Sequence, residues 1–103
     1  MTTYTAEGDA ALLPLHNTPP NVLAYIWYRG EVRSKNRMIA FFFTFATYDV
    51  KGPAYRGRES INANGSLLIE NVTMNDAGMY TVVVYITDVN KEIAFGQLHV
   101  YGE

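Results

Sequence analysis

The stretch "NDAGMYTVVV", residues 75–84, decides how the chain is interpreted. It begins with residues that favour turns and continues into β-branched side chains, which are enriched in strands. Because side chains alternate along a strand, Tyr80, Val82 and Val84 fall on one face and Val83 on the other. The stretch therefore predicts a turn that leads directly into a strand with apolar residues on both faces.

Runs rich in β-branched and aromatic residues recur along the rest of the chain, at residues 10–16, 23–29, 37–45, 66–72 and 93–101. Glycine and proline turns separate these runs, and the dipeptide Asn64-Gly65 is a strong signal for a two-residue hairpin. Pro14 cannot donate to a β-ladder, so we expect the first run to form an edge strand. The chain has no internal repeat or composition break, and we predict one all-β domain over residues 1–103, a sandwich or a barrel.

The composition limits what the chain is expected to do. Hydrophobic residues make up 49% of it and aromatic residues 14%, which is typical of a packed domain and not of a disordered chain. The formal net charge of −2 gives no reason to expect nucleic acid or a membrane surface as a partner. No apolar run approaches the length of a membrane span, and "MTTYTAEG" at the start lacks the apolar core of a signal peptide. We therefore expect no direct membrane contact.

The residue types needed for catalysis or metal binding are missing from the pattern. The chain has no cysteine, which excludes a thiol nucleophile and a disulfide. His16 and His99 belong to different strands and show no ligand spacing to each other. The glycines mark turns, and none of them precedes a helix as a phosphate-binding loop would. We therefore expect no enzyme activity, no metal and no cofactor.

A set of core positions follows the layout of an immunoglobulin domain. Trp27 is the single tryptophan, Leu15 precedes it by 12 residues, and Val82 follows Tyr80 by two. In immunoglobulin domains a cysteine–tryptophan–cysteine constellation has this layout. We therefore expect Leu15, Trp27, Tyr80 and Val82 to lie in the core, with aliphatic side chains in both bridge positions. The alternative, that Trp27 is an ordinary core tryptophan, also places it in the core.

The start of the strand at Tyr80 carries two further expectations. The Tyr80 hydroxyl is expected to bond back to the backbone near the strand corner, as a tyrosine corner does. Asp76 has a candidate partner in Arg58, and an arginine–carboxylate pair can form two parallel hydrogen bonds. We expect Arg58 and Asp76 to form a structural salt bridge that clamps one end of the sandwich; a functional charge pair is the alternative.

The motifs together resemble one family. They are "LHN" at 15–17, "WYRG" at 27–30, "GPAYRGRESI" at 52–61, "NGSLLIENVT" at 64–73, "NDAGMYT" at 75–81 and "GQLHVYGE" at 96–103. Over residues 5–103 the chain resembles the N-terminal variable-type domain of the carcinoembryonic-antigen-related cell adhesion molecules (CEACAMs), whose close relatives include the pregnancy-specific glycoproteins. The resemblance implies an immunoglobulin V-set β-sandwich without the inter-sheet disulfide, with sheets A′GFCC′C″ and (A)BED. It also implies that the Arg58–Asp76 salt bridge helps to close the sandwich.

The chain departs from the family pattern at three places. Only "MTTYT" precedes "AEG", so we expect the family's first strand to be missing and the strand at 10–16 to lie at an edge. Pro14 stands where the family usually has an aliphatic residue, and the face described below is more apolar than expected. A truncated or redesigned domain is therefore an alternative to an unmodified natural one.

Two tripeptides have the form of N-glycosylation sites, at Asn64 and at Asn71. Both match positions that are glycosylated in the family, which implies that their sheet is covered by sugar and is not the main contact face. The alternatives are that Asn64 serves the hairpin turn and that such tripeptides arise by chance. We expect at least one of the two to be used in a secreted form.

Strand alternation predicts an apolar outward face on the other sheet. It places these residues inward: Tyr25, Trp27, Ile39, Phe41, Val82 and Val84. It places these residues outward or at the ends of the face: Leu23, Ile26, Tyr28, Met38, Ala40, Phe42, Thr44, Val83, Tyr85 and Val89. Since a solvent-facing sheet normally alternates to polar residues, this set predicts a protein-binding face. The alternative is that the segment 45–50 folds over part of it.

The resemblance implies what this face would bind. In the family it carries homophilic and heterophilic adhesion and is the target of bacterial adhesins. We therefore expect an extracellular domain, on the cell surface or secreted, whose partners are itself as a homodimer, related CEACAM-type domains or bacterial adhesins. The alternative is a one-sided heterophilic module, such as a receptor for bacterial adhesins or an engineered CEACAM-like binder. The basic segment 29–37 is expected to be a solvated turn, with an acidic partner as the alternative.

Overall fold

The computed structural model of the chain describes residues 2–15, 21–31, 33–45, 48–87 and 90–102. Nine strands and two short 3₁₀ helices are found in these residues: β1 (Thr2–Ala6), β2 (Ala11–Leu13), β3 (Ala24–Arg29), η1 (Lys35–Arg37), β4 (Met38–Phe43), β5 (Tyr48–Lys51), β6 (Glu59–Ile61), β7 (Leu67–Ile69), η2 (Met74–Asp76), β8 (Gly78–Tyr85) and β9 (Lys91–Tyr101). In this part of the chain no helix has the length and apolar character needed to cross a membrane.

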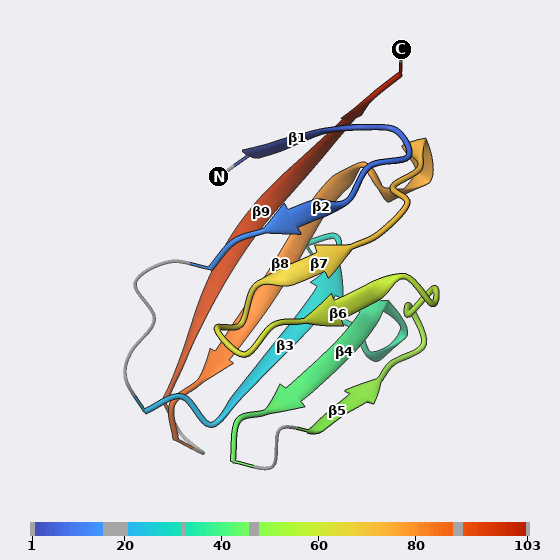
Figure 1. Cartoon of the computed structure of the whole chain (residues 1–103). Helices are drawn as coiled ribbons and strands as arrows, with labels where there is room; N and C mark the ends of the chain where they lie inside the picture. The colour runs from blue at the N-terminus through green and yellow to red at the C-terminus, as the bar shows by residue number, and fades with distance from the viewer. Residues whose placement is uncertain (1, 16–20, 32, 46–47, 88–89, 103) are drawn as a thin grey trace.

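The strands form two sheets that pack face to face (Figure 1). The larger sheet has the order β1-β9-β8-β3-β4-β5, and the smaller has the order β2-β7-β6. Strand β1 runs parallel to β9, and the other pairs are antiparallel. The core lies between the sheets, and its largest fully buried side chains include Trp27, Tyr80 and Ile39. The all-β sandwich predicted from the sequence is therefore confirmed.

Strand β2 is shorter than predicted and lies at the edge of its sheet, as Pro14 led us to expect. It ends at Leu13 because the next residue has no backbone N–H for the ladder. Leu15 leaves the sheet, and its backbone N–H donates to the Ser66 hydroxyl at 3.1 Å. Leu15 therefore packs against the core from outside the strand and is only partly buried.

Three strands lie outside the runs identified from the sequence: β1, β5 and β6. The sheet order A′GFCC′C″ implied by the family resemblance provides for β1 and β5, and the expectation that the first strand is missing is wrong. The first residues of the chain form β1, which pairs with the second half of β9 from Gln97 to Tyr101. The segment that was considered as a cover for the larger sheet instead contributes β5, whose Val50 pairs with Phe41 of β4. The described residues of this segment therefore extend the sheet sideways.

Strand β4 contains a β-bulge that reverses the predicted facing of its second half. Tyr28 pairs with Met38 but Trp27 pairs with Ala40, so Ile39 is an extra residue, and both Ile39 and Ala40 are buried. Residues opposite each other in an antiparallel pair share a face, so Ala40 points inward with Trp27. The prediction that Ala40 and Phe42 point outward and Phe41 inward is wrong.

The centre of the core closes without a disulfide, by packing and by a buried hydrogen bond between the two sheets. The Trp27 indole Nε1 donates to the Gly65 carbonyl of the β6–β7 turn at 2.8 Å, which ties the two sheets together. Gly65 has a φ of +92°, and a Cβ there would collide with the Tyr25 ring, so only glycine fits. Val82 is 2% exposed in the middle of this core. The aliphatic side chain thus takes a buried position, as the immunoglobulin layout predicted.

Candidate functional site: an apolar face and a charged end

The outward face of the larger sheet is defined by strand register. Ile26 of β3 lies opposite Val83 of β8 and Phe41 of β4. Val83 in turn lies opposite Ile93 of β9. We call the following outward side chains of this sheet the apolar face: Ala24, Ile26, Tyr28, Met38, Phe41, Phe43, Val50, Thr81, Val83, Tyr85, Ile93 and Phe95. It crosses five strands without an acidic side chain among these residues. The same register places Met79, Lys91 and Gln97 outward beside it.

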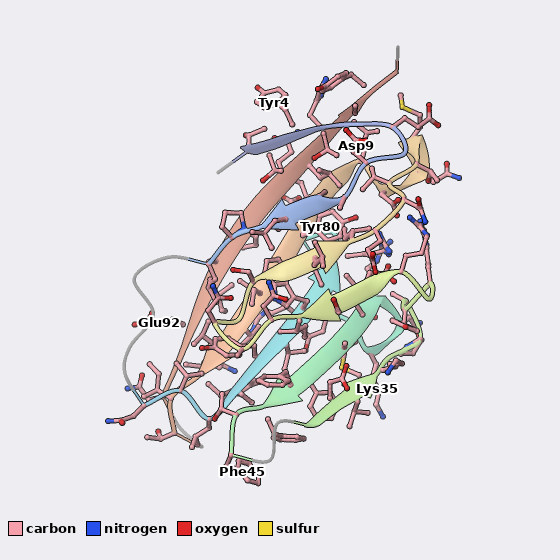
Figure 2. The ribbon with its side chains drawn as sticks, viewed as in Figure 1. Tyr4, Asp9, Lys35, Phe45, Tyr80 and Glu92 are labelled. Carbon is pink, nitrogen blue, oxygen red and sulfur yellow. The ribbon has the colours of Figure 1, made fainter. Side chains whose placement is uncertain are left out.

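One end of the apolar face is hollowed. The hollow has a volume of about 320 Å³ and is lined by Leu23, Ala24, Ile26, Phe41, Phe43, Phe45, Tyr85 and Thr87. Phe41 and Phe43 meet edge to face with ring centroids 4.9 Å apart, and Phe43 lies 5.6 Å from Phe45. Phe45 is 80% exposed and stands at the turn after β4 (Figure 2). Three phenylalanines at alternate positions of the sequence thus line a hollow, which either water or a partner fills.

The structure brings most of the predicted face residues together. Ile26, Tyr28, Met38 and Tyr85 are outward and partly exposed, and Leu23 is 45% exposed at the rim of the hollow. Burial raises the pKa of the Tyr28 phenol above its ordinary value, and the nearby Tyr85 raises it further. Tyr28 is therefore neutral at physiological pH and keeps its proton as a hydrogen-bond donor.

The other predicted face residues have different positions. Val83 is outward but only 1% exposed, so neighbours on the same face cover it and it supports the surface without offering contact area. The Thr44 hydroxyl donates to the Val22 carbonyl at 2.7 Å and so fixes the turn after β4. Ala40 lies in the core and Phe42 packs against it. Val89 lies outside the described residues, and its place in the face stays a prediction.

The large apolar side chains that sequence reasoning missed at this surface and its hollow include Phe41, Phe43, Phe45, Ile93 and Phe95. The first three were hidden by the bulge in β4, which has no sequence signal. Ile93 and Phe95 could have been found, because they alternate with Gly96, Leu98 and Val100, which are buried. Continuing that alternation backward along β9 places both of them outward.

The opposite end of the sandwich is charged and partly buried. The predicted ion pair is present: Arg58 donates through Nη1 and Nη2 to the two carboxylate oxygens of Asp76, at 2.8 and 3.0 Å. The Asp76 side chain is fully buried, and it also accepts the backbone N–H of Thr73 at 2.8 Å. Arg58 donates in addition to the carbonyls of Glu70 and Asn71. The pair is therefore held in one geometry by several hydrogen bonds.

A second ion pair links the two sheets directly. Arg29 at the end of β3 donates to Glu59 at the start of β6, and the Glu59 side chain is fully buried. Arg29 also donates to the Tyr80 hydroxyl at 2.8 Å, and that hydroxyl donates to the Asp76 carbonyl at 2.6 Å. The last bond is the expected tyrosine corner. Arg29, which the sequence suggested to be part of a solvated turn, is 13% exposed and belongs to this network.

The network keeps Asp76 ionised. Burial by itself works to raise the pKa of its carboxyl group. The hydrogen bonds from Arg58 and Thr73 and the charges of Arg58 and Arg29 outweigh burial, so the pKa lies below its ordinary value. The carboxylate is therefore negative throughout the physiological range and balances the arginines around it.

Both predicted glycosylation sites lie on turns at the two ends of β7, in the smaller sheet. Asn64 is exposed, and its side-chain oxygen accepts the Ser66 backbone N–H at 3.0 Å. Asn71 is also exposed and has a left-handed φ of 48°. The apolar face belongs to the other sheet, so sugars at either asparagine would leave that face open.

No group of three or more histidine, cysteine or acidic residues suited to a metal ion is found among the described residues. His99 is exposed on β9, and its ring lies 5.3 Å from that of Tyr4. His16 lies outside the described residues. The side chains described above thus offer contact surface and structural charge pairs, and they do not form an acid–base or nucleophile arrangement.

Known proteins share both the sequence and the fold. The Immunoglobulin V-set domain family matches residues 1–101. The mouse cell adhesion molecule CEACAM5 is 39% identical over 94 residues, which are 91% of this chain and 10% of that protein. The crystal structure of murine CEACAM1b has a TM-score of 0.92 at 36% identity and is matched over 98% of this chain and 52% of that one.

A further solved structure is similar. It is the crystal structure of a mouse coronavirus receptor-binding domain complexed with its murine receptor, with a TM-score of 0.86 at 38% identity. The match covers 96% of this chain and 50% of that chain. The present chain thus spans a tenth of the length of CEACAM5 and about half of the matched chains in the two structures.

Proposed function

Because the chain belongs to the immunoglobulin V-set family as a homologue of the CEACAM cell adhesion molecules, we propose that it is a cell-adhesion recognition domain. It binds protein partners outside the cell through the apolar face. The observation that carries this proposal is the hollow walled by Phe41, Phe43 and Phe45 on the open side of the larger sheet. Exposed clusters of aromatic and methionine side chains are typical of protein interfaces.

The first candidate partner is a second copy of the chain. A symmetric dimer uses the same patch on both copies, so the patch must be complementary to itself. Phe45 protrudes from the rim with 80% exposure, and the hollow beside it is lined by apolar side chains. In a two-fold dimer, the protruding aromatic ring of each copy can insert into the apolar hollow of the other copy. A stable interface of this kind buries about 800 Å² on each partner.

The second candidate is a different protein, bound on the same face. One specific observation favours it: a 38% identical solved neighbour comes from a complex of a mouse coronavirus receptor-binding domain with its murine receptor. Related CEACAM-type domains and bacterial adhesins are the other partners of this class that the family resemblance suggests. An apolar hollow can accept an aromatic or aliphatic side chain from any of them.

Two further features follow from the same proposal. The domain works at the cell surface or in the extracellular space, where the absence of cysteine is compensated by the ion-pair network. At least one of Asn64 and Asn71 carries an N-linked glycan, since both are exposed on the sheet that the proposed contact does not use. Mass spectrometry of the protein secreted from mammalian cells, before and after enzymatic deglycosylation, tests this feature.

Sedimentation velocity over a dilution series tests the homophilic proposal. We expect concentration-dependent dimerisation, and we expect Ile26→Asp or Phe41→Asp to abolish it, because either change puts a charge into the hollow. Leu12→Asp is the matched control: Leu12 is 44% exposed but lies on the smaller sheet, so dimerisation should persist. A monomer at high micromolar concentration would overturn self-association.

The heterophilic candidate is tested with the same variants. Immobilised wild-type domain is probed by surface plasmon resonance with CEACAM N-terminal domains, coronavirus receptor-binding domains and bacterial adhesins. Binding that is lost in Phe41→Asp and retained in Leu12→Asp supports use of the apolar face. If a partner binds the wild type and Phe41→Asp equally well, the contact lies elsewhere and this assignment of the face is wrong.

A further inference from the structure

The basic residues of the chain are gathered at one end. Six of its eight lysines and arginines lie in two segments, residues 29–37 and 56–58, although the whole chain has a net charge of −2. The structure brings the two segments together, because Arg29, Arg56 and Arg58 all approach the Asp76 carboxylate. Glu31, Glu59 and Asp76 offset part of this charge, and the six basic residues leave a local positive excess at the end of the sandwich opposite the apolar hollow.

A polar cleft opens at this end. It has a volume of about 460 Å³ and is lined by Arg29, Ser34, Asn36, Arg37, Pro53, Ala54 and Arg56. Three of the seven lining residues are arginines, and none is acidic. The volume lies in the range of about 300–1,000 Å³ that small-molecule sites occupy. The cleft thus has the size and the charge of a site for an anionic group.

Two of the three arginines have donors to spare. Arg29 is occupied, since it donates to Glu59, to Tyr80 and to the Ala54 carbonyl. Arg37 is exposed, and its guanidinium makes no hydrogen bond within the described parts of the chain. Arg56 uses Nη1 for the Asn75 carbonyl at 3.3 Å and leaves its other side-chain nitrogens open. Its side chain is 43% exposed.

The backbone holds Arg37 at the mouth of the cleft. The 3₁₀ helix η1 returns the chain to the end of β3, next to Gly30, which has a φ of +83°. A Cβ on Gly30 would lie 3.3 Å from Nη1 of Arg37, so the guanidinium rests directly against this glycine. On the other side Ala54 is fixed by its backbone N–H, which donates to the Met38 carbonyl at 2.9 Å. Both walls are therefore built on hydrogen-bonded backbone.

We propose that this cleft binds a sulfated glycan chain, with Arg37 and Arg56 as the sulfate ligands. A guanidinium presents two parallel N–H donors that match sulfate oxygens. Ser34 and Asn36, which also line the cleft, supply side-chain groups for sugar hydroxyls. Arg33 and Lys35 continue the positive charge along the same turn, where Lys35 stands exposed (Figure 2). A chain with repeated sulfates can follow this row beyond the cleft.

The lining favours a sulfated sugar over an acidic peptide. Pro53 and Ala54 are the only apolar members of the lining, so the cleft offers little to an apolar side chain. It also contains no aromatic ring on which a nucleotide base could stack. A polyanion that combines sulfates with hydroxyls uses both kinds of group that the cleft presents. This site is independent of the apolar face and of any partner bound there.

Isothermal titration calorimetry with a heparin-derived hexasaccharide tests the proposal. We expect saturable 1:1 binding at low salt that weakens as sodium chloride is raised, because the attraction is electrostatic. The double variant Arg37→Gln/Arg56→Gln should weaken binding at least tenfold. The matched control, Lys51→Gln/Lys91→Gln, removes the same charge from the two basic residues outside the two segments and should change affinity less than twofold.

Further experiments distinguish the ligand classes and test whether a loss of binding comes from misfolding. Arg37→Gln alone removes a side chain without a hydrogen bond in the described residues, so it should fold normally and still weaken binding severalfold. Amide NMR shifts should concentrate at residues 33–37 and 54–56. Four outcomes would each overturn the proposal. The lysine control could lose as much affinity as the arginine variant, or an unsulfated carboxylated hexasaccharide could bind equally well. A poly-glutamate peptide could bind more tightly, or the hexasaccharide could fail to bind at all.

Discussion

The two ends of strand β3 are built from opposite chemistry. At Ala24 the strand enters an apolar hollow lined by aromatic rings, and at Arg29 it ends in a network of buried carboxylates and arginines. The strand has six residues, so roughly 17 Å separate the two environments. The apolar end leaves hydrophobic area exposed, whereas the charged end buries ions. The charged end thus stabilises the sandwich, and the surface best suited to binding a partner lies at the apolar end.

Buried ion pairs can stabilise the charged end because their hydrogen bonds are satisfied. A buried carboxylate is costly unless its hydrogen bonds are satisfied. Glu59 accepts the backbone N–H groups of Arg56 and Arg58 as well as Arg29, and Asp76 has several donors of its own. No buried side-chain nitrogen or oxygen is left without a hydrogen bond in the described residues. A network satisfied in this way can take over part of the work that a disulfide does in other immunoglobulin domains.

The largest expected effect comes from breaking the charged end. Asp76→Ala should lower the free energy of unfolding by about 3–5 kcal/mol, because it leaves the partly buried Arg58 without its carboxylate partner. Chemical denaturation monitored by Trp27 fluorescence measures this. A loss below 1 kcal/mol would mean that the network does not anchor the sandwich.

The next effect sharpens the assignment of the two faces of β4. Phe42→Ala should cost about 2–3 kcal/mol of stability, because Phe42 packs against the core. Phe41→Ala should cost less than about 1 kcal/mol but weaken binding at the apolar face, because Phe41 lines the hollow. Denaturation and sedimentation of both variants separate the two roles. The reverse pattern would show that the bulge is absent in solution.

A smaller effect is expected from pH. Asp76 has a lowered pKa in the folded state, so its contribution is present in full above the unfolded value of about 3.9. It is lost as the pH falls through the lower folded pKa, and it vanishes below both values. The unfolding free energy of the wild type should therefore drop between about pH 5 and pH 2 more steeply than that of Asp76→Asn. Asp49→Asn is the control and should keep the wild-type slope.

The smallest effect is expected at a surface pair on β5, the edge strand of the larger sheet. Lys51 and Asp49 approach to 3.9 Å, and both side chains are at least 40% exposed. Exposed ion pairs contribute about 0–1 kcal/mol, so Asp49→Ala should change the unfolding free energy by less than about 0.5 kcal/mol. A loss comparable to that of Asp76→Ala would indicate that charge in general, and not the buried network, stabilises the domain.

Much of the fold could be predicted because its signals are local. The tyrosine corner depends on the short motif "NDAGMY", and the edge position of β2 depends on Pro14. The Arg58–Asp76 pair joins residues 18 positions apart and was expected from their opposite charges and from the family resemblance. Trp27 and Val82 follow from the spacing of one well-known layout.

The rest depends on contacts between distant strands. The bulge at Ile39 arises from how β4 meets β3, and no residue in "RMIAFFF" marks it. The role of Arg29 depends on Glu59, which is 30 residues away in the sequence and on the other sheet. Ala40 and Phe42 of β4, which were predicted to point outward, therefore point inward. Arg29, which was expected to be solvated, is largely buried.

The bulge in β4 also has an evolutionary consequence. Anywhere else in this strand, inserting or deleting one residue would turn every following side chain to the opposite face and destroy the phenylalanine wall of the hollow. At Ile39 the extra residue is absorbed locally, so Met38 and Phe41 both face outward although three positions separate them. A related sequence lacking this one residue would keep the same surface at some cost in core packing. Length variation at this position should therefore be read as neutral for recognition, and alignments should place their gaps there.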